Sequence, residues 1–192
     1  MPIMPGIQFI RSVAQGLPFK LGNPIGIVLH RTEAGYNHLL NSFQSGPKVS
    51  HFLIGKKDGQ AVQFVDSKHK AAHVGPGANA LYIGVEFESI PARSGYKGQD
   101  PLVILDDLTP FQINIGRDVI EWICRTHFIP KVGPPSSAAW RKCKGHWRGV
   151  LGHANVAEGS FFHTDHGDTL QAKDFIALGV WPAAGNRPKF LY

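Results

Sequence analysis

The sequence predicts an α/β protein, and three observations support this fold class. Short apolar runs bounded by turn residues predict strands. An Asp-Gly pair between two of these runs predicts a β-hairpin. A capped segment with apolar residues at every fourth position predicts a helix. With 192 residues and 43% hydrophobic content, we expect one domain over residues 1–192, with its core at about 24–180.

Three strands are expected before residue 66. The apolar run Pro24–His30 lies between turn residues and predicts a buried strand that ends at His30. Val49–Ile54 and Gln60–Val65 flank the Asp58-Gly59 pair, which predicts a hairpin. Because function concentrates on loops that a rigid scaffold positions, a histidine at the end of a strand faces a candidate site.

The segment Tyr82–Glu88 alternates in a way that is typical of a strand with one face in the core. Its apolar face carries residues 83, 85 and 87. Glu86 and Glu88 share the other face, together with Tyr82 and Gly84. The strand therefore presents two carboxylates on one face.

The first predicted helix begins after residue 109. Thr109 is a favourable N-cap, Pro110 suits the first helical position, and Gln112 completes a capping box. We expect the helix to bury one apolar stripe and to end before Pro130. The stripe consists of Phe111, Ile115, Val119 and Ile123.

The rest of the chain predicts short elements and long connections. Val150–His153 predicts a short strand or turn that again ends in a histidine, and Thr169–Gly179 predicts a last helix closed by its glycine. Pro91–Leu108 and Pro130–Gly149 lack periodicity and predict long loops. Of the two cysteines, which are too few for a disulfide framework, Cys124 is expected in the core.

Charge and hydropathy restrict the function classes. A formal charge of +6 and a pI near 9.4 favour a polyanionic partner, which includes nucleic acid, anionic lipid and the acidic polymers of a bacterial envelope. The charge alone does not choose among them. The N-terminal segment lacks a basic leader and contains prolines, which makes it a poor signal peptide, and no apolar run reaches the length of a membrane span.

Two apolar runs deliver His30 and His153, and Asp165 follows on a glycine-bearing loop. Two imidazoles and one carboxylate are typical ligands of catalytic zinc, whose fourth position stays open for water. The same set fits a ferrous facial triad. The histidines also fit ordinary packing, so their spacing alone leaves these alternatives open.

Five blocks of the sequence together resemble one family. They are VLHRT, VSHFLIGKKDGQAVQFVD, AAHVG, YIGVEFES and GHANVAEGSFFHTDHGD, from about Ile25 to Gly167. Their order and spacing resemble the zinc-dependent N-acetylmuramoyl-L-alanine amidases, a type shared by phage lysozyme-type amidases, cytoplasmic anhydro-muropeptide amidases and animal peptidoglycan recognition proteins. The resemblance implies a single amidase domain with a central mixed β-sheet flanked by helices.

The resemblance also implies roles for particular residues. The ligands of Zn²⁺ match His30, His153 and Asp165. The catalytic glutamate follows a Gly-Val pair and matches Glu86, with Glu88 as the fallback on the same strand face. A basic residue two positions before the third ligand matches His163, which would stabilise the oxyanion.

The resemblance also makes three further residues candidates for substrate contact: His51 and His73, which lie in these blocks, and Asn79, which matches an asparagine near the groove of family members. Core packing accounts for the two histidines equally well. The sequence departs from many family members at Ser50, where they carry a tyrosine, so no phenol is available there.

The reaction implied by the resemblance is hydrolysis of the amide bond between N-acetylmuramic acid and L-alanine, in peptidoglycan or in muropeptides. The alternatives are a recognition module that binds peptidoglycan without cutting it and a metal-dependent nuclease. Asp165 and Glu86 favour the enzyme over the recognition module. A nuclease explains only one of the five blocks, so we expect no nucleic-acid partner.

A poor signal peptide in a wall-degrading enzyme suggests delivery by another route. We expect action in the periplasm or on the cell wall of another bacterium, after phage lysis or as an antibacterial effector of type VI secretion. A cytoplasmic recycling enzyme is the alternative. An inhibitor or immunity protein is a further expected partner.

Overall fold

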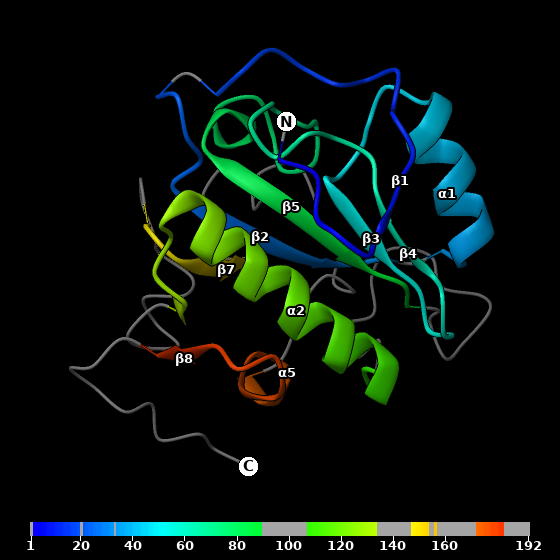
Figure 1. The fold of residues 1–192 in the computed structure, drawn as a ribbon, viewed down its shortest axis with the longest axis vertical. Helices are drawn as coiled ribbons and strands as arrows, with labels where there is room; N and C mark the ends of the chain where they lie inside the picture. Colours follow the sequence, from blue (N-terminus) through cyan, green and yellow to red (C-terminus); the bar gives the residue numbers. More distant parts are fainter. Residues whose placement is uncertain are drawn as a thin grey trace, which may run out of the picture.

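A six-stranded mixed sheet forms the centre of the molecule (Figure 1). The structure is a computed structural model that describes residues 2–19, 21–32, 34–89, 107–133, 147–153, 156 and 172–182. The strands of the sheet are β1 (Gln8–Phe9), β2 (Gly26–Arg31), β3 (Phe52–Ile54), β4 (Ala61–Gln63), β5 (Tyr82–Phe87) and β7 (Val150–Gly152). Their order is β1-β4-β3-β5-β2-β7, and β3, β5, β2 and β7 run parallel. The mixed sheet flanked by helices is confirmed.

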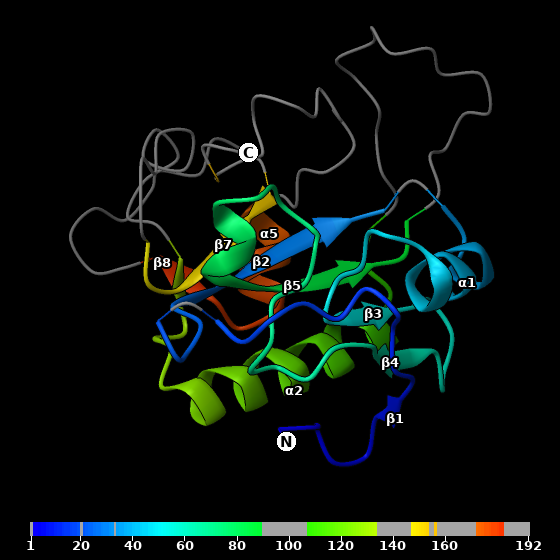
Figure 2. The ribbon, with the colours of Figure 1, turned by 90° about the horizontal axis from the view of Figure 1, so that it is seen from above.

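Helices cover both faces of this sheet (Figure 2). On one face, α2 (Pro110–His127) packs with the residues that follow α5 (Ala172–Ala177) against the apolar side chains of Phe52 and Ile54. On the other face, α1 (Tyr36–Ser45) packs against a cluster that contains Leu53. Because successive strand residues point to opposite faces, β3 alone contributes to both layers.

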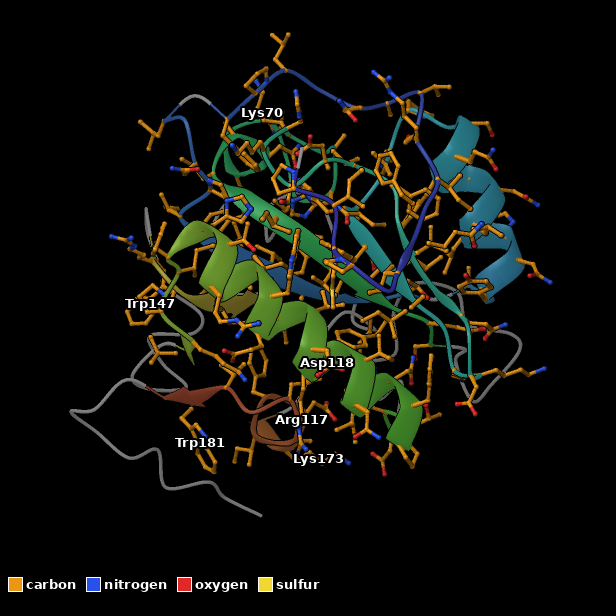
Figure 3. All side chains as sticks on the ribbon, viewed as in Figure 1. Lys70, Arg117, Asp118, Trp147, Lys173 and Trp181 are labelled. Atoms are coloured by element: carbon orange, nitrogen blue, oxygen red, sulfur yellow. The ribbon has the colours of Figure 1, made fainter. Side chains whose placement is uncertain are left out.

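The C-terminal elements complete the layer that holds α2. Arg117 of α2 donates a hydrogen bond to the carbonyl of Ala177 at the end of α5, and Figure 3 shows this arginine next to α5. The strands β6 (Val132–Gly133) and β8 (Trp181–Pro182) form a separate parallel pair. The described helices include none that is long and apolar enough to cross a membrane.

The five predicted strands are present as β2, β3, β4, β5 and β7, whereas β1, β6 and β8 were not predicted, and β6 lies within the segment Pro130–Gly149 that was predicted to be a loop. The antiparallel pair β3–β4 brackets the predicted turn, and Gly59 adopts φ +78°, a conformation that glycine reaches without strain. In β5, Ile83, Val85 and Phe87 all belong to the core beneath α2. The expected strand at 150–153 is β7, which ends one residue before His153.

Helix α2 also follows its prediction. The Thr109 side chain accepts the backbone N–H of Gln112 at 3.2 Å, and the Gln112 side chain accepts the backbone N–H of Thr109 at 3.0 Å. The helix ends at His127, before Pro130, and Cys124 is buried in the core. The predicted last helix is present as α5, whereas most of the two predicted long loops lies outside the described residues.

The sequence analysis missed α1. Its N-cap, Gly35, offers no side chain to the free backbone N–H groups of the first turn. Glu88 replaces that cap from the end of β5, since its Oε1 accepts the backbone N–H of Tyr36 at 2.9 Å. The stabilising group is 52 residues away in the chain, so no local pattern reveals it.

Candidate active site

The pairing of β2 with β5 brings the first candidate histidine to the candidate glutamate. In this parallel pair, His30 is the register partner of Glu86. The His30 Nδ1 lies 3.9 Å from the Glu86 Oε1, and the histidine is only 2% exposed. Because side chains alternate along a strand, His30 points to the same face of the sheet as Val28, and Glu86 points to the same face as Tyr82. The cluster that contains Val28 and Tyr82 lies on the face opposite α2. This is also where the carboxyl ends of parallel strands meet, a common position for sites in α/β proteins.

The pairing of β2 with β7 adds the second candidate histidine. Leu29 is the register partner of Gly152, so the next residues of the two strands, His30 and His153, come together. Their Nδ1 atoms are 3.1 Å apart, although the residues are 123 positions apart in the chain. The tertiary structure thus brings together two of the three predicted metal ligands.

This distance is suitable for a shared metal ion. Two nitrogens bound to one tetrahedral zinc at about 2.0–2.1 Å lie roughly 3.3 Å from each other. The two converging nitrogens of His30 and His153 are therefore close to the spacing of a tetrahedral edge. The third predicted ligand, Asp165, and the predicted oxyanion donor, His163, lie outside the described residues. Within the described part of the chain, no group of three ligand side chains is assembled.

Ser50 is a residue of this site that the sequence analysis noted only as a missing tyrosine. It is buried, and its Oγ donates a hydrogen bond to the Glu86 Oε1 at 3.1 Å. A donated hydrogen bond of this kind favours the ionised carboxylate and limits its orientations. The only sequence signal for this role of Ser50 was its position just before His51 in the second sequence block.

The structure separates the two candidate glutamates. Glu88 lies beyond the end of β5, where its two oxygens accept the backbone N–H groups of Tyr36 at 2.9 Å and Lys56 at 2.8 Å. It is 8% exposed, and its own carbonyl accepts the side chain of Gln112. Glu88 therefore joins α1, the hairpin and α2, while Glu86 stands beside His30.

His73 contacts His30 from the segment between β4 and β5. The His30 Nε2 lies 2.9 Å from the His73 Nδ1, and the His73 Nε2 lies 3.1 Å from the carbonyl oxygen of Tyr82. Desolvation holds the pKa of His73 well below its usual value, and the neighbouring His30 lowers this pKa further. Both effects favour the neutral form of the ring.

Asn79 holds the backbone of this segment. Its Oδ1 accepts the backbone N–H groups of His73 at 2.9 Å and of Val74 at 2.8 Å. The carbonyl of the asparagine, which was expected to contact substrate, is thus used to position His73.

His51 lies inside the fold. Its Nε2 lies 2.8 Å from the carbonyl oxygen of His69, and its Nδ1 accepts the backbone N–H of Gly84 at 3.0 Å. Burial lowers its pKa to about 4, although the hydrogen bond to His69 partly opposes this shift. The side chain is fully buried, so its contacts are with the interior of the sheet rather than with a groove.

Comparisons with known proteins agree with this architecture. Residues 20–168 match the family described as N-acetylmuramoyl-L-alanine amidase. A search of curated proteins gives no significant match. Among solved structures, the fold is similar to AmpD in its selenomethionine form, with a TM-score of 0.58, 18% identity, and 92% of this chain and 96% of that chain covered.

Two further solved structures share the fold. The amidase LysC from Clostridium intestinale gives a TM-score of 0.54 at 18% identity and covers 92% of this chain and 99% of its own. AmpDh3 from Pseudomonas aeruginosa, solved with an anhydromuramic pentapeptide, gives a TM-score of 0.58 at 20% identity, with 82% and 60% of the two chains covered. At these identities, the likeness concerns the fold.

Proposed function

Because the chain belongs to the N-acetylmuramoyl-L-alanine amidase family, whose members act on peptidoglycan, we propose that it cleaves the amide bond between N-acetylmuramic acid and L-alanine with the help of a zinc ion. His30, His153 and Asp165 are the proposed ligands of this ion. Glu86 is the proposed general base and acid, and His163 the proposed donor to the oxyanion.

One observation supports this assignment most strongly. The Nδ1 atoms of His30 and His153 converge to 3.1 Å at the edge of the sheet, and the Glu86 carboxylate is 3.9 Å from the first of them. A catalytic zinc site needs ligand side chains that converge on one point, and a carboxylate beside it can serve as the general base. Glu86 is suited to this role because it stands next to His30 and Ser50 orients its carboxylate.

The proposed chemistry divides the work among these groups. A zinc ion held by His30, His153 and Asp165 would act as a Lewis acid that polarises the scissile carbonyl and lowers the pKa of water to about 7. Glu86 accepts the proton of the attacking water and returns it to the leaving amine of L-alanine. His163 donates a hydrogen bond to the oxyanion that forms on the substrate carbonyl.

The substrate is peptidoglycan or a muropeptide released from it. The neighbour AmpDh3 was solved with an anhydromuramic pentapeptide, which is such a fragment. The formal charge of +6 supports attraction to the anionic wall of a bacterium, and this favours action on intact wall over recycling in the cytoplasm. Antibacterial delivery by type VI secretion or phage lysis, and control by an inhibitor protein, are further parts of the proposal that rest on the sequence.

The experiment compares two substrates under metal control. Purified protein is incubated with intact sacculi and with a soluble anhydro-muropeptide, first as isolated, then after chelation, and then after zinc is returned. Mass spectrometry identifies the products. The expected result is release of free stem peptides that chelation stops and zinc restores, with sacculi as the better substrate at low salt.

The matched variants are Glu86→Gln and Glu88→Gln, because both change one carboxylate of the same segment. Release of stem peptides should be lost in Glu86→Gln and should persist in folded Glu88→Gln. Intact substrate under every condition would overturn the proposed hydrolysis and favour a recognition module, and cleavage that survives complete chelation would overturn the zinc site.

A further inference from the structure

A line of hydrogen-bonding groups runs from the candidate metal site into the fold. It begins at the His30 Nε2, passes through the Nδ1 and Nε2 of His73, and ends at the carbonyl oxygen of Tyr82. The two distances are 2.9 and 3.1 Å, and both lie within the usual range of protein hydrogen bonds.

The carbonyl at the end of this line fixes the direction of every bond in it. A carbonyl oxygen only accepts, so the His73 Nε2 must carry a proton. A neutral imidazole has one N–H, so the His73 Nδ1 is an acceptor and the His30 Nε2 must donate to it. His30 then has its lone pair on Nδ1, the nitrogen that faces His153.

The surroundings hold His73 in this orientation. Asn79 fixes the backbone of the residue through two hydrogen bonds. The ring lies against β5 at Gly84, where an added Cβ would come within 2.6 Å of the His73 Cγ and Nδ1. Only glycine leaves room for an imidazole this close to the strand, which explains why Gly84 stands before Val85 in the fourth sequence block.

We propose that His73 is a positioning residue that holds His30 in the Nε2-protonated form, with its Nδ1 lone pair aimed at the metal. This inference rests on the proposed function, because it gives the lone pair a metal to bind. Groups that hydrogen-bond the outer nitrogen of a ligand histidine fix its tautomer and orientation in this way. No contact of His73 with substrate is required.

The same reasoning predicts what stays fixed at the site. Zinc held between His30 and His153 would use the Nδ1 lone pair of each ring, so it would leave the Nε2 protons of His30 and His73 where they are.

Two measurements test the proposal, and the first needs no activity. Long-range ¹H–¹⁵N spectra of the metal-free protein report which nitrogen of each histidine is protonated, with assignment by single histidine variants. We expect His30 and His73 to be protonated at Nε2, both before and after zinc is added.

The second measurement is zinc affinity, by competition with a chromophoric chelator. His73→Leu should weaken zinc binding about 10- to 100-fold, the usual loss when such a supporting group is removed. His73→Asn should largely restore the affinity, because its Oδ1 takes the place of the Nδ1 acceptor. His127→Gln is the matched control: His127 is also a buried histidine, but its Nε2 bonds to Ser67, away from His30, so its zinc affinity should equal that of the wild type.

The outcomes separate the two proposals. A proton on the His30 Nδ1, or wild-type zinc affinity in His73→Leu, would overturn the role of His73 and leave the metal site standing. Failure of the wild type to bind zinc would overturn the metal site itself, and the tautomer spectrum would still decide whether His73 orients His30. If His73→Leu does not fold, the wild-type spectrum and His73→Asn carry the test.

Discussion

His30 and Glu86 occupy matching positions in two neighbouring parallel strands, and this register places the His30 Nδ1 3.9 Å from the Glu86 Oε1. A parallel ladder fixes such a pair more firmly than loops do, because every hydrogen bond of the two strands would have to shift to separate the residues. The site therefore has a rigid base on β2 and β5, onto which β7 brings His153.

Glu86→Gln and Glu88→Gln should have opposite effects. Loss of the general base should lower kcat by about 10²- to 10⁴-fold with little change in melting temperature. Glu88→Gln should lower stability by about 1–3 kcal/mol, because one of its two backbone N–H partners loses its acceptor. Activity assays and thermal unfolding of both variants measure this contrast, and a large kcat loss in folded Glu88→Gln would contradict it.

Ser50→Ala should reduce the rate through Glu86. The lost hydrogen bond of 3.1 Å leaves the carboxylate less well oriented, and a cost of about 0.5–1.5 kcal/mol corresponds to a fall in kcat of up to about tenfold. KM should change little. Ser67→Ala is the control, since Ser67 is also buried and also bonds an ionisable side chain, His127. Equal kcat in both variants would show that Ser50 has no role in catalysis.

Gly84→Ala should weaken zinc binding as well as stability. Its Cβ would meet the His73 ring at 2.6 Å and the Ser50 Oγ at 2.9 Å, so it displaces the group that orients His30. Gly59→Ala provides the comparison: it places alanine at φ +78° with no atom within 4 Å of its Cβ. That variant should lose stability from backbone strain alone. The prediction fails if the two variants bind zinc equally tightly.

Stability should fall as the pH is lowered from about 6.5 toward 4. Burial lowers the pKa of both His51 and His127 to about 4, so in this window the unfolded chain binds these two protons and the folded protein does not. Each histidine contributes at most about 1.4 kcal/mol per pH unit to the loss.

Urea unfolding at several pH values measures this slope. His127→Gln should make it shallower by up to one proton, since glutamine does not titrate. An unchanged slope in this variant would show that His127 does not remain neutral in the folded state.

Local sequence determined the elements whose stabilising contacts are themselves local. The Thr109 capping box, the turn at Gly59 and the alternation of β5 each involve residues within a few positions of one another, and all three are present as predicted. The sequence also placed His30 and His153 at the ends of apolar runs, and so identified the residues that meet.

The tertiary structure decided what depends on contacts between distant segments. Helix α1 is capped by Glu88, which lies just beyond the end of β5, so the sequence of the helix itself did not reveal it. Alternation put Glu86 and Glu88 on the same face, and only the packing of α1 and the hairpin around Glu88 left Glu86 for the site. His51 and His73 were equivalent in the sequence, but the fold buried the first beside β5 and set the second, in the segment that Asn79 holds, against His30. A pattern in the chain reports which side chains share a face, whereas the partner of each polar atom is set by segments that meet only when the sheet assembles.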